Sequence, residues 1–428
     1  MAETMSTYAT LDEWVAREAR PFALDDADNF EVAVDHLIAA LGNDVAVLAL
    51  GEGMHGGVDL LRLRNRLFQR LVVAHGYSAI ALESSFPRGR LVNDYAAGRG
   101  SDNYGAVAES GFSHGFGKLT ANRELVEWIR AYNADPAHNV PLHVYGFDGA
   151  TEMWGSDSPR LLLAFVLDYF ATLDAARARV YRQRIEPLLG ADAAWENPTA
   201  TMDPAQYIGG SPATAALRLE TEALLTELRL HRPEQTTLAD AGRLMEAEHY
   251  AEQTRQLLTY HAEMAHPSGD RTARLLGLRD LMMANNLAYI IGQEQAQGRG
   301  KVLAFAHNSH VQRGEAAWQL GTISVRWWPA GAHLEEMFGH RYAVIGTGVG
   351  AAVAHGLGQP EAGTLEARLT AAPGPGRFVP THRGQGLSTT EVAALPTRSD
   401  SQQNKSYVAL APRSLSDFDW LAVLDTTA

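Results

Sequence analysis

AVLALGEGMHGG, residues 46–57, is an apolar run that ends in an acidic residue, Glu52, and a histidine, His55. This pattern predicts a buried parallel strand that is followed by a polar turn. A second stretch of the same form, VLAFAHNSH, covers residues 302–310 and ends in two further histidines. Two strands far apart in the chain are therefore expected to end in the same kinds of titratable side chain.

Two more apolar runs end in carboxylates. SAIALE, residues 78–83, ends in Glu83, and LHVYGFD, residues 142–148, ends in Asp148. The four runs predict an α/β protein with a mostly parallel central sheet flanked by helices. In open sheets of this kind the ligand crevice lies beyond the carboxyl ends of the strands. We therefore expect the polar residues at these ends to meet at one edge of the sheet: Glu52, His55, Glu83, Asp148, His307 and His310.

Helical periodicity fills much of the chain between these runs. Residues 59–75 repeat leucine at helical spacing and stop before Gly76, so a strand–helix–strand unit is predicted there. Further helices are expected within residues 10–41, 124–134 and 271–295. Additional strands are expected at 322–327, 342–347 and 420–425, and loops at 371–406, which are rich in Pro, Gly, Ser and Thr.

One long segment shows only helical periodicity. It covers residues 158–264, and the stretches 214–230 and 238–264 within it predict long paired helices. We expect an α-helical insertion, or lid, at residues 150–270. The α/β catalytic core would then consist of residues 1–149 and 271–428.

Composition limits the partners of this protein. The 36 Lys and Arg residues against 50 Asp and Glu residues give a net charge of −14, which disfavours nucleic acid and anionic membranes. The absence of cysteine excludes thiolate catalysis and Cys-ligated zinc. Residues 1–6 lack the features of a signal peptide, and no apolar run approaches the roughly 20 residues that span a bilayer. A cytoplasmic protein with a small-molecule substrate is expected, and its oligomeric state stays open.

A histidine beside a carboxylate is suited to general base catalysis. His55 titrates near neutrality and can take a proton from water, while Glu52 or Glu83 orients its ring. His307, Asn308 and His310 are candidates to donate hydrogen bonds to a developing oxyanion, and Arg64, on the following helix, is a candidate fixed positive charge. The reaction that fits these groups is water attack on an acyl carbon.

A serine hydrolase is one alternative. GFSHG, residues 111–115, matches the G-x-S-x-G elbow, and the order Ser113, Asp148, His307 is the order of that fold. The elbow serine needs a strong apolar strand before it, and residues 104–110 form a poor one. This alternative is therefore ranked below the histidine–water reaction.

A metallohydrolase is the other alternative. Several of the residues at the expected edge are acceptable ligands for zinc or manganese, and two pairs of them are three residues apart. These pairs lie on turns, where that spacing fixes no geometry, so we expect no metal and no other cofactor. The residues concerned are Glu52, His55, Glu83, His307 and His310.

Taken in order, these segments resemble the erythromycin esterase family. The Gly-Glu-x-x-His segment of that family corresponds to Gly51–His55, and its His-Asn-x-His segment corresponds to His307–His310. The intervening matches are the strand that ends in Glu83, the Trp-x-x-x-Tyr-Asn helix at Trp128–Asn133, the Gly-x-Asp strand end at Gly146–Asp148, and the Arg-Asp-x-x-Met-x-x-Asn helix at Arg279–Asn286.

The resemblance implies metal-free hydrolysis of a macrocyclic lactone. In that family the histidine that matches His55 is the proposed base. We therefore predict a hydrolase that opens an ester or macrolactone of a bulky, macrolide-like natural product. The predicted catalytic residues are His55, Glu52 and Glu83, and the predicted substrate-binding residues are Arg64, Asp148, Arg279, His307, Asn308 and His310.

Two other functions stay open on the same scaffold. A tailoring enzyme of natural-product biosynthesis could use the same base for lactone formation, elimination or rearrangement. A protein that only sequesters a drug is the non-enzymatic possibility, and the full set of polar edge residues argues against it. The mass of the product separates hydrolysis from rearrangement, because only hydrolysis adds water.

Overall fold

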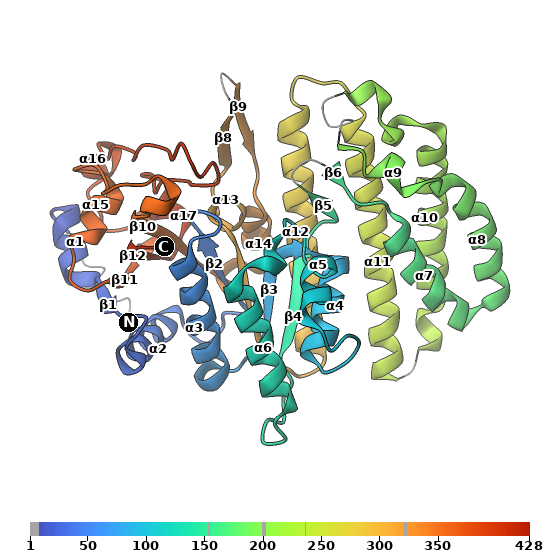
Figure 1. The fold of residues 1–428 in the computed structure, drawn as a ribbon, viewed down its shortest axis with the longest axis horizontal. Helices are drawn as coiled ribbons and strands as arrows, with labels where there is room; N and C mark the ends of the chain where they lie inside the picture. Colours follow the sequence, from blue (N-terminus) through green and yellow to red (C-terminus); the bar gives the residue numbers. More distant parts are fainter. Residues whose placement is uncertain (1–7, 153–154, 199–202, 236, 321–322) are drawn as a thin grey trace.

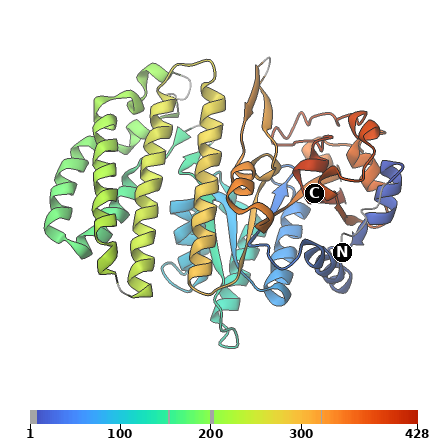
Figure 2. The same cartoon turned by 180° about the vertical axis from the view of Figure 1, so that it is seen from behind.

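An eight-stranded sheet runs through the centre of the protein (Figures 1 and 2). The computed structural model describes residues 8–152, 155–198, 203–235, 237–320 and 323–428, so the prediction for residues 1–6 lies outside the described part. The strand order is β1-β11-β12-β10-β2-β7-β3-β4. The strands are β1 (Arg20–Phe22), β2 (Val47–Glu52), β3 (Tyr77–Ser85), β4 (His143–Asp148), β7 (Lys301–His307), β10 (Tyr342–Ala351), β11 (Gly376–Pro380) and β12 (Trp420–Thr426).

The predicted α/β class with a mostly parallel sheet is confirmed. Strands β12, β10, β2, β7, β3 and β4 are parallel to their neighbours in this group, and only β1 and β11 pair antiparallel at the edge. The four strands that end in charged residues or histidine lie next to one another as β2-β7-β3-β4. Glu52 is in register with His307, and Ser85 with Asp148, so these strand ends are level.

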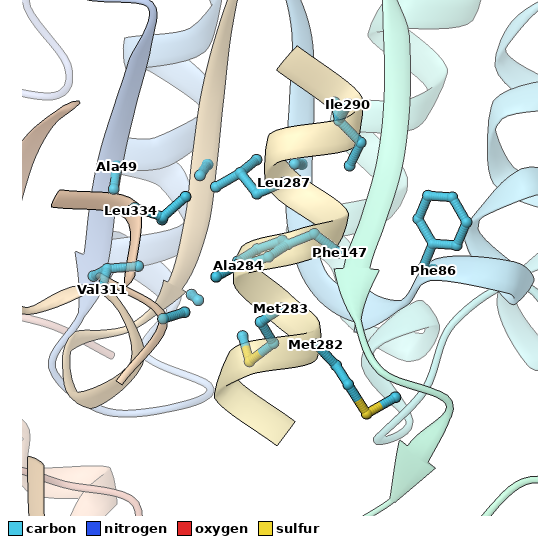
Figure 3. Close-up of a cluster of buried hydrophobic side chains, with 14 of the residues drawn as sticks. Ala49, Phe86, Phe147, Met282, Met283, Ala284, Leu287, Ile290, Val311 and Leu334 are labelled. Carbon is cyan, nitrogen blue, oxygen red and sulfur yellow. The ribbon is translucent and has the colours of Figure 1, made fainter. Parts of the chain in front are cut away.

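Helices cover both faces of the sheet because alternate residues of each strand point to opposite sides. Leu48 and Leu50 of β2 belong to the same hydrophobic cluster as Leu67 of α3, whereas Val47 and Ala49 face the cluster of α12. Figure 3 shows the second cluster, in which the alanines let α12 lie close to the strands. The covering helices are α1 (Leu11–Glu18), α2 (Ala27–Leu41), α3 (Val58–His75), α4 (Phe86–Ala96), α5 (Tyr104–Ser110), α6 (Thr120–Ala134), α12 (Arg271–Ala296) and α14 (Ala330–Phe338).

A group of helices stands beside the sheet at the end where β4 lies (Figure 1). Ser211 and Thr237 cap two of these helices, each accepting a hydrogen bond from a backbone N–H of the first turn. The group consists of α7 (Arg160–Leu173), α8 (Ala175–Leu189), α9 (Asp192–Trp195), α10 (Pro212–Leu230) and α11 (Leu238–Met264), preceded by the short strands β5 (Thr151–Glu152) and β6 (Gly155–Ser156). The boundaries of the insertion at residues 150 and 270 stay a prediction.

Two segments differ from the sequence-based expectation. Residues 371–406 are not only loop, because β11 lies within them and pairs with β12; the glycines and prolines around this short strand hide its apolar pattern. The predicted strand 322–327 is β9 (Ile323–Trp327), which pairs with β8 (Ala316–Leu320) in a separate hairpin that projects beyond the sheet (Figure 1); Thr322 lies outside the described residues.

The remaining short helices are α13 (Asn308–Val311), α15 (Leu365–Thr370), α16 (Thr389–Ala393) and α17 (Ser414–Asp417). Helix α13 starts directly after β7 and turns the chain at the edge of the sheet. Among the described helices, none combines the length and the apolar character that crossing a membrane requires.

Candidate active site

A histidine–carboxylate pair lies at the end of β2. His55 Nδ1 is 2.8 Å from Glu52 Oε2, and the His55 side chain is 28% exposed, which leaves it open to water. Glu52 is buried, and its other oxygen, Oε1, has no hydrogen-bond partner among the described residues. Burial favours the neutral ring, but the charge of Glu83 and the hydrogen-bonded Glu52 outweigh it, so the pKa of His55 is raised above its ordinary value.

His307 packs beside this pair, with its ring centroid 5.1 Å from that of His55. Its Nδ1 accepts a hydrogen bond from the backbone N–H of Ser309 at 3.2 Å, and its Nε2 donates to the carbonyl of Ser406 at 2.7 Å. Both ring nitrogens are therefore engaged in a neutral tautomer. Burial and the nearby His55 lower the pKa of His307 to about 3, so this ring stays neutral. The oxyanion role predicted for it would require one of these bonds to break.

A short segment near the C-terminus holds both histidines in place. The Ser406 Oγ accepts from the backbone N–H of His55 at 2.8 Å, and Asn404 Nδ2 donates to the His55 carbonyl at 2.9 Å. Asn404 Oδ1 in turn accepts from the hydroxyl of Ser406 at 2.6 Å. Sequence reasoning missed these residues, because they lie in a stretch that carries no periodic pattern and no motif.

Arg279 joins the ends of β3 and β4. Its Nη2 donates to Asp148 Oδ2 at 2.6 Å and to Glu83 Oε1 at 3.0 Å, and its Nε donates to Asp148 Oδ1 at 3.0 Å. The second Glu83 oxygen accepts the backbone N–H of His307 at 2.7 Å. Burial alone would raise the pKa of both carboxyls. The charges of His310 and His55 nevertheless hold the pKa of Glu83 well below its usual value, and Arg279 lowers that of Asp148.

His310 is held by a carboxylate that sequence reasoning missed. Its Nδ1 lies 2.8 Å from Oδ1 of the fully buried Asp280, which also accepts from Trp327 Nε1 at 2.6 Å and from the Ala330 N–H at 2.9 Å. Burial favours neutral His310, but the charges of Asp280 and Glu83 outweigh it and raise the pKa of His310 to about 10. A positively charged His310 therefore stands at the site, and Trp327 ties the β8–β9 hairpin to it.

Arg64 is a buried cation without a carboxylate partner among the described residues. It donates to the side-chain oxygens of Asn122 and Asn65, each at 2.7 Å, and lies 4.9 Å over the ring of Phe305. Burial lowers its pKa to about 10, against the opposing charge of Glu52. Arg64 lines a small pocket of about 20 Å³ together with Glu52, Glu83, Phe116 and Phe305. The predicted fixed positive charge therefore lies beside the His55 pair.

Asn308 uses its side-chain amide to connect two strand ends, so neither of its polar atoms is left unbonded to face the pocket. Its Nδ2 donates to the carbonyl of Thr347 at 2.8 Å, and its Oδ1 accepts the Thr347 N–H at 3.1 Å. These bonds connect the start of α13, directly after β7, to β10 on the other side of β2. A Cβ atom at Gly51 would lie 2.1 Å from Asn308 Oδ1, so glycine is required where the two strands pass this side chain.

Ser113 does not have the surroundings of a nucleophile elbow. The residues before it form helix α5 and not a strand, and its Oγ accepts the backbone N–H of Ser85 at 2.9 Å. It lies in the sheet-facing interior and is 1% exposed. The structure gives no support to the Ser113, Asp148, His307 triad, because Asp148 pairs with Arg279 and His307 with Ser406.

The candidate metal ligands are also engaged with protein groups. Glu52 pairs with His55, Glu83 with Arg279, and His310 with Asp280. Within the described residues, no group of three or more His, Asp or Glu side chains is arranged to hold a metal ion.

Comparisons with known proteins identify the family of this chain and proteins that share its fold. The model of the erythromycin esterase family matches residues 72–427. Erythromycin esterase type II of Escherichia coli is 24% identical over 343 residues, or 78% of this chain and 76% of that protein. A crystal structure of a Bacillus cereus protein has a TM-score of 0.73 at 18% identity and covers 97% of both chains. A mutant of the erythromycin esterase EreC in its open conformation has a TM-score of 0.64 at 18% identity, covering 96% of this chain and 98% of that one.

The fold is that of an α/β protein with a parallel sheet, and a histidine–carboxylate pair stands at the ends of its strands. The chain belongs to the erythromycin esterase family, as the segments from Gly51 to His310 predicted. Membership of this family indicates a hydrolase that acts on esters.

Proposed function

We propose that this protein opens an ester or macrolactone of a bulky, macrolide-like natural product by water attack, with His55 as the general base. The observation that carries the proposal is the 2.8 Å contact between His55 Nδ1 and Glu52 at the level of the neighbouring strand ends. A carboxylate only accepts hydrogen bonds, so Nδ1 carries the proton and Nε2 is left to accept one from water. The name of the Escherichia coli relative, erythromycin esterase type II, supports a macrolide as substrate.

The reaction needs one water and one shuttled proton. Water attacks the carbonyl carbon while His55 Nε2 takes its proton, and a tetrahedral oxyanion forms. The carbon–oxygen bond of the ester then breaks, and the imidazolium returns the proton to the departing alkoxide. The products are a carboxylic acid and an alcohol, which in a lactone are the two ends of one hydroxy acid. Glu52 orients the ring, and Glu83 favours its charged form.

Charge balance points to Arg64 as the group that stabilises the oxyanion. The cations Arg279 and His310 are matched by three buried carboxylates, which are Glu83, Asp148 and Asp280. Arg64 has only neutral partners, so its charge is available to an anion that forms in the pocket it lines. Arg279 and His310 would then hold these three carboxylates in place at the edge of the sheet that faces the substrate. The helices of residues 150–270 would cover a large substrate.

Mass spectrometry of a macrolide panel tests the proposal. Wild type treated with a chelator is expected to convert at least one member into a product heavier by one water, because the proposed base and oxyanion group are both side chains. A product of unchanged mass would favour the tailoring enzyme, and tight binding without turnover would favour the sequestering protein. Loss of activity on chelation, restored by zinc or manganese, would favour a metallohydrolase.

The pH profile of kcat/KM should show a limb that belongs to His55. Only the neutral ring can act as a base, and the pKa of His55 is raised, so activity is expected to fall as the pH drops through a midpoint above the ordinary value of about 6.5. In Glu52→Gln the hydrogen-bonded charge is lost, so the midpoint should move to lower pH. Glu336 is exposed, so Glu336→Gln is the control and should leave the midpoint of the pH profile unchanged. A midpoint that rises in Glu52→Gln would contradict the assignment.

The segment that holds the histidines has a separate test. Asn404→Ala removes the bond to the His55 carbonyl and the support of Ser406, so kcat is expected to fall about 10- to 100-fold through misplacement of the base, with KM little changed. Gln402→Ala alters an exposed neighbour in the same segment and should retain wild-type kcat. Equal kcat values for the two variants would show that the segment does not position His55.

A further inference from the structure

Tyr260 lies near the C-terminal end of α11, in the group of helices that stands beside β4 (Figure 1). Its ring packs in a small cluster with Met264 of the same helix and with Leu275 and Leu278 of α12. Leu278 directly precedes Arg279, the residue that joins the ends of β3 and β4. Tyr260 therefore stands next to the charged strand ends, although it belongs to the helix group and not to the sheet.

The phenol of Tyr260 is turned towards the ion pair of Arg279 and Asp148. Burial raises the pKa of Tyr260 to about 12, and the charges that also act on the phenol are those of Arg279, Asp148 and Arg271. Two of these three groups belong to the candidate active site. The phenol is protonated at neutral pH, so it has a hydrogen to donate there.

This phenol is buried but unpaired. Among the described residues, none forms a hydrogen bond with the Oη atom of Tyr260, although the residue is only 9% exposed. The oxygen is nevertheless not closed off from water. A buried tyrosine normally finds a partner, as Tyr207 of the same cluster does by donating to the carbonyl of Trp195 at 2.8 Å. An open, unpaired phenol in such a position indicates a partner from outside the chain.

The charged groups near the phenol are already engaged. Asp148 accepts from Arg279 Nη2 at 2.6 Å and lies 3.1 Å from His114 Nε2. Arg271 donates to the carbonyl of Met264 at 2.9 Å. An ionic ligand would have to displace one of these partners, whereas a neutral acceptor needs only the hydrogen of the phenol. The partner that suits Tyr260 is therefore a hydroxyl, ether or carbonyl oxygen.

The strand order sets the size of the molecule that carries this oxygen. β2 and β4 are separated by β7 and β3, so three strand spacings of about 4.8 Å place their ends roughly 14 Å apart. His55 follows β2, whereas Tyr260 faces the end of β4. A molecule that reaches both must be bulky, and the oxygen at Tyr260 must lie far from the ester at His55.

We propose that Tyr260 is a further substrate-binding residue, which donates a hydrogen bond from its phenol to a neutral oxygen of the substrate remote from the ester. The inference rests on the proposed function, because the ligand is the macrolide-like substrate itself. It assigns to the helix group a direct contact that favours bulky esters over short ones.

Titration calorimetry with the macrolide panel, erythromycin included, tests this contact. The parent is His55→Ala, which binds without turnover. Adding Tyr260→Phe removes one oxygen and keeps the ring against Leu275 and Leu278, so Kd is expected to rise about 3- to 10-fold through loss of one hydrogen bond. Tyr260→Leu takes its place if that variant does not fold. Tyr169→Phe is the matched control on α7 and should leave Kd unchanged.

A kinetic measurement separates binding from an indirect effect through Arg279. In the otherwise wild-type chain, Tyr260→Phe should raise KM for the macrolide by the same factor and leave kcat unchanged. A lower kcat at unchanged KM would overturn the proposal, because the phenol would then act on the chemistry through the ion pair.

The outcomes also distinguish this inference from the proposed function. A macrolide that wild type hydrolyses, with the same Kd and KM in the presence and absence of the phenol, overturns the role of Tyr260 alone. A macrolide that binds more weakly to the Tyr260→Phe protein but is never hydrolysed overturns the esterase reaction alone. Absence of both binding and hydrolysis across the panel overturns both.

Discussion

His55→Ala is expected to lower kcat for ester hydrolysis by about 10²- to 10⁴-fold, the range that a positioned general base contributes. The variant loses Nε2 of His55, the ring nitrogen that is not bonded to Glu52 and can accept a proton from water. Glu52 and Arg64 remain in place. KM should change little, because the ring acts on water and not on the carbonyl group. Steady-state kinetics with the macrolide that wild type hydrolyses provide the measurement.

Two comparisons distinguish a lost base from a disturbed fold. Added imidazole should restore part of the activity of His55→Ala, since it can occupy the space of the side chain and accept the proton. His333→Ala, which changes a histidine of α14 away from the pocket, should keep wild-type kcat. If His55→Ala hydrolyses the substrate at the wild-type rate, water activation by this residue is wrong, and Ser113 or a metal ion must be considered again.

Arg279→Met is expected to lower the free energy of unfolding by about 3–5 kcal/mol, the usual cost of removing one partner of a buried ion pair. The substitution leaves Asp148, which is 0% exposed, and Glu83 without the guanidinium that bridges them. Urea denaturation measures the effect. Arg274→Met, on the same helix, removes the ion pair of a largely exposed arginine with Glu263 and should cost far less stability than Arg279→Met.

The loss of unfolding free energy in Arg279→Met should depend on pH and should be smaller at acidic pH than near neutrality. Arg279 lowers the pKa of Asp148 in the folded protein, and a group with a lowered pKa stabilises the fold at pH values above its unfolded pKa. Without Arg279, burial raises that pKa, so the carboxyl becomes protonated at a higher pH. The difference between wild type and variant is therefore largest near neutrality and narrows towards acid. A difference that widens as the pH falls would contradict this electrostatic explanation.

The sequence predicts the arrangement of the strand ends because local patterns suffice there. Each of the runs that end at Glu52, Glu83, Asp148 and His307 is apolar and short, and parallel strands bring their carboxyl ends to one edge. The bond between His55 and Glu52 follows from their closeness in the chain. Family resemblance added Arg279, whose contacts with two strand ends no local pattern indicates.

The parts that could not be predicted depend on contacts between distant segments. Asn404 and Ser406 reach His55 across more than three hundred positions of the chain, and nothing in their own neighbourhood marks them. Asp280 stands next to Arg279 in sequence, yet its partners are His310 and Trp327, which come from two other elements. Such partners are fixed by packing of the whole core and not by periodicity.

The order of strands in the sheet also has a consequence for the synthesis of the protein. β7 lies between β2 and β3, although it is made long after both. At about 5–20 residues per second, roughly 10–50 s pass between the emergence of β2 and that of β7 from the ribosome. During this interval β2 and β3 lack the strand that pairs with both of them, so backbone N–H and C=O groups of their edges stay unpaired. The nascent chain is therefore exposed to aggregation for most of its translation. Its folding in cells should benefit from a lower growth temperature or from chaperones.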